Sequence, residues 1–312
     1  MWRRLTLLWV LSGLTVPGIL AAQDLRGARP MGMGHAYRSV APGNDAIYYN
    51  PAGMTAVPKY SPEFYGQYNP DRNLFELDLT VVDSLTNQVG VGLGYTFTNR
   101  EPGDEAVRGH RATAAVSYPI VPGVFNVGLS FKYLNISQAL AGTFVNALTA
   151  DAGLLVTPGL GLAFAVVGYN VIPITTNEAP MGMAAAASWS IEGLTLAFDW
   201  GLDFESSWPP GMQFHAGAEY YLLDMFPLRV GYENDQVTGL SAVTFGLGFA
   251  YDVFGIDLGY QQGLERFDDR TIGVALKFFL FAPPPPSAVA GTYNAGPRGG
   301  LPAYQQPMSI SQ

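Results

Sequence analysis

The sequence contains no cysteine, few charged residues and no long apolar run after its first 22 residues. Without cysteine, a disulfide-stapled scaffold, thiolate chemistry and cysteine-ligated metals are excluded. Charged residues make up 13% of the chain, against roughly 25% in ordinary soluble domains. A transmembrane helix needs about 20 consecutive apolar residues, and no segment after residue 22 supplies them. The composition is therefore unlike that of a soluble domain or of a helical membrane protein.

Motifs of the common catalytic classes are also missing. There is no Gly-x-Ser-x-Gly, no phosphate-binding loop and no His-Glu-x-x-His. The three histidines, His35, His110 and His215, lie far apart, and no serine–histidine pair of a barrel phospholipase is recognisable. The net charge of −9 leaves no electrostatic footprint for nucleic acid. We therefore predict no catalytic residue, no metal ligand, no cofactor and no nucleic-acid partner.

The two ends of the chain differ in composition from the rest. Residues 1–22 place two arginines before an apolar run and end in Ala21-Ala22, which predicts a secretory signal peptide. Residues 282–312 hold a run of prolines followed by a Gly/Pro/Ala/Gln-rich stretch. Such a composition cannot bury a core, so we predict a disordered tail. The chain is thus predicted to be exported and to fold between these two segments.

From Tyr60 onward, apolar residues recur at every second position. Between Leu194 and Leu202, for example, large apolar side chains alternate with Thr, Ala, Asp and Gly. About fourteen such segments can be distinguished, each close to the ~10 residues with which a tilted strand crosses a bilayer. The pattern predicts an all-β fold, a transmembrane antiparallel β-barrel of about 14 strands over residues 59–281. The strands are expected to begin near Tyr60, Asn73, Gln88, Arg108, Val124, Phe144, Leu160, Met181, Leu194, Met212, Leu228, Ser241, Phe254 and Thr271.

The connections between these segments alternate in length. Short turns such as 157–159, 191–193 and 252–253 alternate with longer stretches such as 99–107 and 170–180. Membrane barrels have short turns at the periplasmic end and longer loops at the opposite end. Connection length therefore supports a membrane barrel independently of the strand pattern.

The same alternation places a set of charged residues on the inner side of the barrel wall. Charges enclosed in this way must be paired or hydrated. We interpret them as a salt-bridge network between wall and lumen contents, with an ion-selective pore as the alternative. The predicted lumen charges are Glu76, Asp78, Arg111, Lys132, Asp151, Asp199, Glu219, Arg229, Glu233, Asp257 and Lys277.

Residues 23–58 show no sustained alternation and are rich in turn formers. They contain a run from Gly27 to Ala36 of the form G-x-x-x-M-G-x-G-x-A, followed by Tyr48-Tyr49-Asn50-Pro51-Ala52-Gly53. These elements resemble the N-terminal plug of the FadL-type outer-membrane proteins. The resemblance implies that residues 23–58 form a plug in the lumen. Its motif residues are Gly32, Gly34, Asn50, Pro51, Ala52 and Gly53.

The resemblance implies a place and a function. It implies the outer membrane of a Gram-negative bacterium and passive uptake of hydrophobic compounds, such as long-chain fatty acids or hydrocarbons. In that family the compound passes the plug and leaves sideways through a gap in the wall. The long-chain fatty acid transporters are longer and carry extended outer loops, whereas the longest predicted outer connection here is residues 170–180. The alternative is a PorV/PorQ-like scaffold that serves secretion or surface attachment without transport.

Two further segments imply partners. The last strand, Thr271 to Phe278, resembles the C-terminal signal by which outer-membrane barrels are recognised by the barrel-assembly machinery. The tail at residues 282–312 is either a simple extension or a handle for a periplasmic or secretion partner. Membrane lipid and a hydrophobic small molecule complete the partners that we expect.

Overall fold

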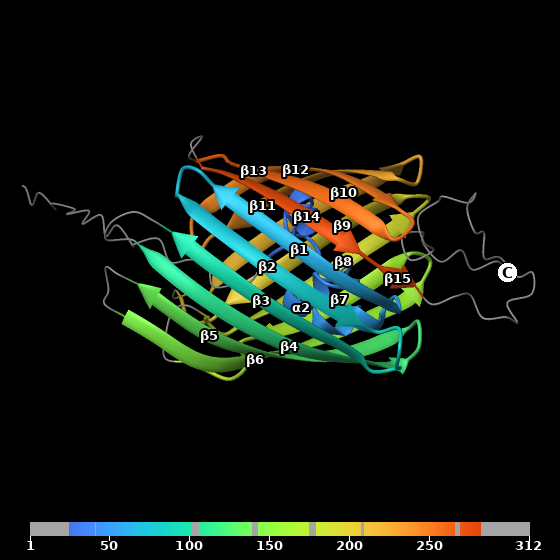
Figure 1. The fold of residues 1–312 in the computed structure, drawn as a ribbon, viewed down its shortest axis with the longest axis horizontal. Coiled ribbons are helices and arrows are strands. Elements are labelled where there is room, and N and C mark those ends of the chain that lie inside the picture. The colour runs from blue at the N-terminus through green and yellow to red at the C-terminus, as the bar shows by residue number, and fades with distance from the viewer. Residues whose placement is uncertain are drawn as a thin grey trace, which may run out of the picture.

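Fourteen long strands close into one antiparallel β-barrel in the computed structural model (Figure 1). The structure describes residues 25–40, 42–100, 106–138, 143–174, 179–206, 209–265 and 269–281, so the predicted signal peptide and tail lie outside it. Each strand pairs with its neighbours in chain order. The strands are β1 (Lys59–Asn69), β2 (Leu74–Asp83), β3 (Gly90–Arg100), β4 (Val107–Val121), β5 (Phe125–Gln138), β6 (Thr143–Gly159), β7 (Leu162–Tyr169), β8 (Gly182–Ile191), β9 (Leu194–Asp203), β10 (Gly211–Leu222), β11 (Phe226–Asp235), β12 (Leu240–Tyr251), β13 (Phe254–Gly263) and β14 (Arg270–Phe278).

The barrel closes because β14 pairs with β1, from Glu63 opposite Lys277 to Tyr68 opposite Ile272. A two-residue strand, β15 (Leu280–Phe281), follows β14 and pairs with the start of β1. The predicted barrel of about fourteen strands is confirmed. Every strand begins within two residues of its predicted start.

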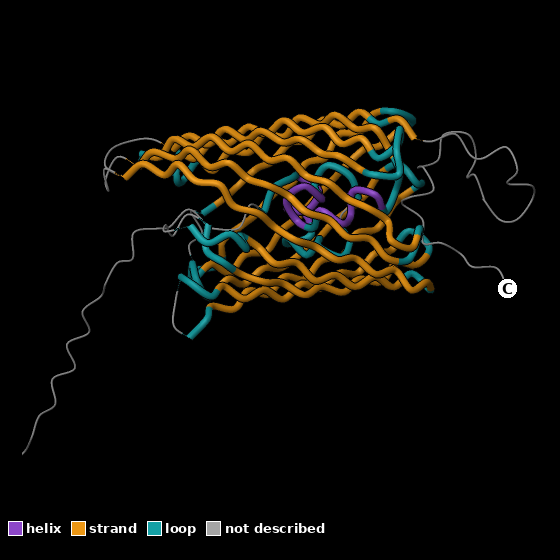
Figure 2. Tube along the Cα trace, turned by 90° about the horizontal axis from the view of Figure 1, so that it is seen from below, coloured by secondary structure: helices purple, strands orange, loops and turns teal. Residues whose placement is uncertain are grey.

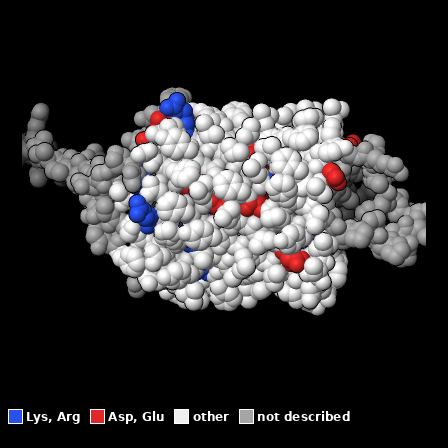
Figure 3. Space-filling model, viewed as in Figure 1, with Lys and Arg blue, Asp and Glu red and all other residues white. Residues whose placement is uncertain are grey.

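The alternation of the sequence becomes an apolar outer wall and a polar inner wall. In β9, Leu196 and Phe198 point outward and are about half exposed, whereas Ala197 and Asp199 point inward and are buried. Uncharged residues cover most of the wall on the face shown in Figure 3, with a few acidic atoms visible near its middle. A continuous exposed apolar band with an enclosed polar interior is typical of a barrel that lies in lipid.

The two ends of the barrel differ in their connections. Five of the six connections at one end contain two or three residues, whereas those at the other end contain four to twelve. We call these the short-turn end and the long-connection end. The predicted alternation of short and long connections is thereby confirmed. The longest connection spans residues 170–181, between β7 and β8.

Residues 25–58 lie inside the barrel (Figure 2), and we call them the lumenal segment. They form two short helices, α1 (Ala28–Gly32) and α2 (Ala46–Tyr49), and a 3-10 helix, η1 (Pro51–Thr55). Nearly all of their described side chains are buried. The helices of the described residues are too short and not apolar enough to cross a membrane.

Candidate functional site: the contact between the lumenal segment and the barrel wall

Glycines of the wall let the backbone of the lumenal segment approach closely. A Cβ atom at Gly128 of β5 would lie 2.3 Å from the backbone of Pro51 and Ala52. Gly217 of β10 and Gly231 of β11 face the backbone of Met33 and Gly34 in the same way. No side chain fits at such distances, so glycine is needed at these wall positions for the two motif runs to pack against the wall.

The backbone conformation at Gly34 also requires glycine. Its φ of 59° lies in the left-handed region, where a Cβ atom is disfavoured. Its amide donates to Thr244 Oγ1 of β12 at 2.9 Å, while Thr244 Oγ1 donates to the carbonyl of Gly32 at 3.2 Å. The run around Gly32 and Gly34 is therefore held against β10, β11 and β12.

Asn50 connects the second motif run to the wall. Its Nδ2 donates to the carbonyl oxygens of Arg38 and of Leu154 in β6, both at 3.1 Å. Its Oδ1 accepts from the amide of Ala52 at 3.1 Å, which caps η1 at the position where Pro51 begins it. The Asn-Pro-Ala-Gly run thus ends α2, starts η1 and binds β6 through one side chain.

A buried ion pair joins the middle of the segment to β9. Asp199 Oδ2 accepts from the amides of Tyr37 and Arg38 at 3.0 Å and from Arg38 Nη1 at 3.1 Å. Arg38 Nε also donates to Tyr169 Oη of β7 at 2.8 Å. Neither charged side chain is exposed. Removing one partner of such a pair typically costs ~3–5 kcal/mol, because the other charge remains buried and unpaired.

A larger ionic network lies towards the short-turn end. Arg29 donates to both carboxylate oxygens of Glu219, at 2.9 and 2.6 Å. Arg229 bridges Glu219 and Asp257, each at 2.6 Å. Lys277 Nζ lies 3.2 Å from Asp257 Oδ2. The same ammonium lies 3.6 Å from Asp45 and 3.5 Å from Glu63, so segment and wall share one network of alternating charges.

The remaining predicted lumen charges are also buried on the inner wall. Glu76 pairs with Arg26 of the segment at 3.0 Å, and Asp78 accepts from Tyr48 Oη at 2.7 Å. Lys132 Nζ lies 2.8 Å from Asp151 Oδ1, which also accepts the amide of Asn170 and so holds the start of the longest connection. Arg111 lies on β4 opposite Thr96 of β3. Glu76 and Asp78 thus join the wall to the lumenal segment, and Asp151 joins two wall strands and the connection after β7.

A histidine cluster was not predicted as a unit from the sequence. His35 and Tyr49 of the segment share a 2.5 Å hydrogen bond. His35 Nε2 and His215 Nδ1 lie 3.8 and 3.9 Å from Glu233 Oε2. Burial, with the nearby charge of Arg38, lowers the pKa of His35 to about 3. The register of β10 against β11 places His215 opposite Glu233, and the fold of the lumenal segment adds His35 and Tyr49, so sequence spacing gave no signal.

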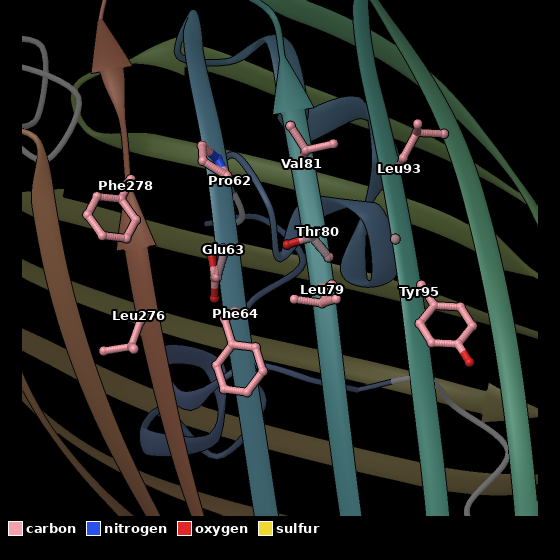
Figure 4. Close-up of a pocket in the computed structure, with 11 residues that line it drawn as sticks. Pro62, Glu63, Phe64, Leu79, Thr80, Val81, Leu93, Tyr95, Leu276 and Phe278 are labelled. Atoms are coloured by element: carbon pink, nitrogen blue, oxygen red, sulfur yellow. The ribbon is translucent and has the colours of Figure 1, made fainter.

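A hollow lies on the outer wall where the ladder between β1 and β14 is interrupted (Figure 4). Ser61 and Pro62 pair with β2, but the register with β14 begins only at Glu63 and that with β15 ends at Tyr60. Pro62 has no amide hydrogen to donate. The hollow has a volume of about 490 Å³. Its lining is Pro62, Glu63, Phe64, Leu79, Thr80, Val81, Leu93, Gly94, Tyr95, Leu276 and Phe278.

The lumenal segment lies directly behind this outer-wall hollow. Asn44 Nδ2 donates to the carbonyl of Ser61 at 2.8 Å and to Thr80 Oγ1 at 2.9 Å. A Cβ atom at Gly94 would lie 2.4 Å from Tyr48 Oη. This interrupted part of the ladder is therefore backed by Asn44 and Tyr48.

Comparison with solved structures identifies the architecture. The CymD monoaromatic hydrocarbon channel superposes with a TM-score of 0.63 and 12% identity, over 83% of this chain and 98% of the channel. The Ralstonia pickettii toluene transporter TbuX gives 0.61 and 12%, over 83% and 100%, and the P. putida toluene transporter TodX gives 0.59 and 14%, over 84% and 100%. The chain has the fold of the FadL-type channels. No family model and no curated protein matches the sequence.

The shared fold establishes the architecture alone. What the protein can bind depends on the residues of this chain. Within the described residues, no group of three or more His, Asp or Glu side chains could hold a metal ion. The buried charges lie against one another or against the segment, as described above.

Proposed function

We propose that this protein is an outer-membrane channel through which hydrophobic compounds enter a Gram-negative cell passively. The observation that supports this most is the fold shared with three hydrocarbon channels over more than four fifths of the chain. In this proposal the short-turn end faces the periplasm and residues 23–58 are the plug. The neighbours are transport proteins, which favours transport over the PorV/PorQ-like scaffold function and over an enzyme.

The finer proposal is that the compound leaves sideways through the outer-wall hollow. The interrupted pairing at Ser61 and Pro62 supports it, because β1 has no register pair with β14 or β15 at these two residues. The lining, which is apolar apart from Glu63 and Thr80 and the hydroxyl of Tyr95, suits a compound that prefers lipid to water. Asn44 and Tyr48 would have to move from behind the wall for the path to open.

Uptake by whole cells tests the transport function. Cells that express the full chain should accumulate a labelled monoaromatic hydrocarbon or long-chain fatty acid faster than cells with an empty vector. A variant lacking residues 24–58 should change this rate, provided that its barrel folds. Uptake by the full chain equal to that of the empty vector for both compounds would refute transport. In that case, recovery of a secretion protein by pull-down would support the scaffold function instead.

A further inference from the structure

Glu63 of β1 borders two cavities. It lines the outer-wall hollow, and it also lines a cavity of about 30 Å³ between the wall and the lumenal segment, which we call the inner cavity. The inner cavity lies within the ionic network around Lys277. Ser61 and Pro62, where β1 has no register pair with β14 or β15, directly precede Glu63. The apolar hollow and the charged inner cavity therefore share one carboxylate residue beside the break in the ladder.

Glu63 belongs to a row of inward residues that crosses four strands. Register places Glu63 opposite Lys277 of β14 on one side and opposite Thr80 of β2 on the other. Gly94 of β3 lies opposite Thr80 and continues the row. Directly opposite residues of neighbouring strands have Cβ atoms about 4.5–5.5 Å apart. One small polar group in the hollow can therefore contact both Glu63 and Thr80, which line it together.

The polar groups beside the break can accept further hydrogen bonds. Lys277 Nζ lies 3.5 Å from Glu63 Oε1, which is longer than the distance of about 2.7–3.2 Å in a hydrogen bond. A carboxylate has about four lone-pair sites, so Glu63 has capacity for a further donor. Among the described residues, Ser61 Oγ and Asn44 Oδ1 are buried without a hydrogen-bond partner, and Asn44 lines the inner cavity with Glu63. A hydrogen-bond donor is therefore the chemical group that this place is suited to receive.

These acceptors distinguish apolar compounds by their head groups. A hydrocarbon without a polar group brings no donor to Glu63, and a carboxylate head would place a second negative charge beside it. A hydroxyl group both donates and accepts. It can donate to Glu63 while its oxygen accepts from Thr80, whose Oγ1 itself accepts from Asn44 Nδ2 at 2.9 Å. A neutral hydroxyl is therefore the head group that fits this floor of the hollow.

The rest of the hollow fits an apolar body. It spans the four strands from β14 to β3, which is three strand spacings of ~4.8 Å or ~14 Å. Its volume of about 490 Å³ lies within the range of roughly 300–1,000 Å³ that is usual for ligand pockets. A single aromatic ring with a short alkyl chain is of this size. Figure 4 shows the apolar side chains around the level of Glu63, which are Phe64, Leu79, Leu276 and Phe278.

We infer that the outer-wall hollow binds an apolar compound with one hydroxyl group, such as an alkylphenol, with the hydroxyl on Glu63 and Thr80 and the apolar body against the outer wall. The inference rests on the proposed function, because it names the class of compound that the proposed exit prefers. Binding in the hollow is measured without transport, so the two can fail separately.

Equilibrium dialysis against the full chain in lipid nanodiscs tests this site, with empty nanodiscs as the baseline. The probes are 4-hexylphenol, hexylbenzene and 4-hexylbenzoate, which share the ring and the alkyl chain and differ in the head group. We expect saturable binding of one 4-hexylphenol per barrel and roughly tenfold weaker binding of the other two, which is the effect of one hydrogen bond to a charged group. Glu63→Gln and Thr80→Val should each weaken binding of 4-hexylphenol several-fold and leave binding of hexylbenzene unchanged. Thr195→Val, the matched change on the inner face of β9, should bind like the wild type.

A further variant tests the place of binding. Leu79→Trp fills the hollow and leaves Glu63 and Thr80 in place, so it should weaken binding of all three probes. Folding of each variant is checked by heat-dependent migration on a gel. Equal binding of 4-hexylphenol and hexylbenzene by the wild type, or unchanged binding of 4-hexylphenol by a folded Leu79→Trp, would overturn the inference. Absence of uptake by cells whose protein binds 4-hexylphenol normally would instead count against the transport function alone.

Discussion

At the scale of single residues, the fit of segment to wall depends on glycines that no larger residue can replace. Gly128→Ala places a methyl group 2.3 Å from the backbone of Pro51 and Ala52. Overpacking of this kind typically costs ~1–3 kcal/mol, so the unfolding midpoint in vesicles should fall accordingly. Gly109→Ala is the matched control, since its methyl group would meet Ile136 and Thr98 only at 3.6 Å. Equal unfolding midpoints for the two variants would show that the close contact at Gly128 does not hold the segment.

We predict that the folded protein loses stability in mild acid because of His35. Burial lowers its folded pKa to about 3, below the ordinary histidine value of 6.5, so the folded state favours the neutral imidazole. The stabilisation that it contributes is fully present above pH 6.5 and is lost as the pH falls towards 3. At pH 5 the loss amounts to about 2 kcal/mol. The groups that face it are Tyr49, Glu233, His215 and Arg38.

The variant His35→Asn tests this pH dependence. Asparagine tolerates the left-handed backbone that His35 adopts, with φ of 62°, and it does not titrate in this range. The free energy of unfolding of the variant should fall less between pH 8 and pH 5 than that of the wild type. Parallel curves for the two proteins would contradict the assignment to His35.

At the scale of elements, the strands could be predicted and their partners inside the barrel could not. A period of two fixes which residues face inward, so Asp199 and Glu219 were placed by parity alone. What each inward charge contacts depends on how the lumenal segment folds. Arg29 meets Glu219 across 190 positions of sequence, and no local pattern encodes that distance. Pro62, which interrupts the ladder, stands in the sequence of β1, but its position opposite the end of β14 depends on a register that this sequence does not contain.

Pro62 also gives a prediction for β1. Pro62→Val restores an amide hydrogen and lets β1 extend its pairing towards the end of β14. If the compound leaves here, uptake should fall about fivefold, since one hydrogen bond contributes ~1 kcal/mol net. The same assay on Pro119→Val, a strand proline outside the hollow, serves as the control. Unchanged uptake with Pro62→Val would place the exit elsewhere.

At the scale of the whole molecule, the lumenal segment offsets part of the negative charge of the inner wall. The segment contributes three arginines and one aspartate, Arg26, Arg29, Arg38 and Asp45. The inward faces of the described strands carry more acids than bases. The acids are Glu63, Glu76, Asp78, Asp151, Asp199, Asp203, Glu219, Glu233, Asp235 and Asp257, and the bases are Lys59, Arg100, Arg111, Lys132, Arg229 and Lys277.

Removal of the segment should therefore turn the barrel into a cation-selective pore. Without residues 25–58, water fills the lumen and the excess of wall carboxylates attracts cations. In planar bilayers the full chain should show little conductance, whereas the shortened chain should conduct, with a reversal potential in a salt gradient that favours cations. A variant that also carries Glu76→Gln, Asp78→Asn and Glu233→Gln should be less selective, because the wall then has nearly as many bases as acids. Anion selectivity of the folded, shortened barrel would contradict this account of the lumen. If the folded, shortened barrel does not conduct, parts of the protein other than the segment close the lumen.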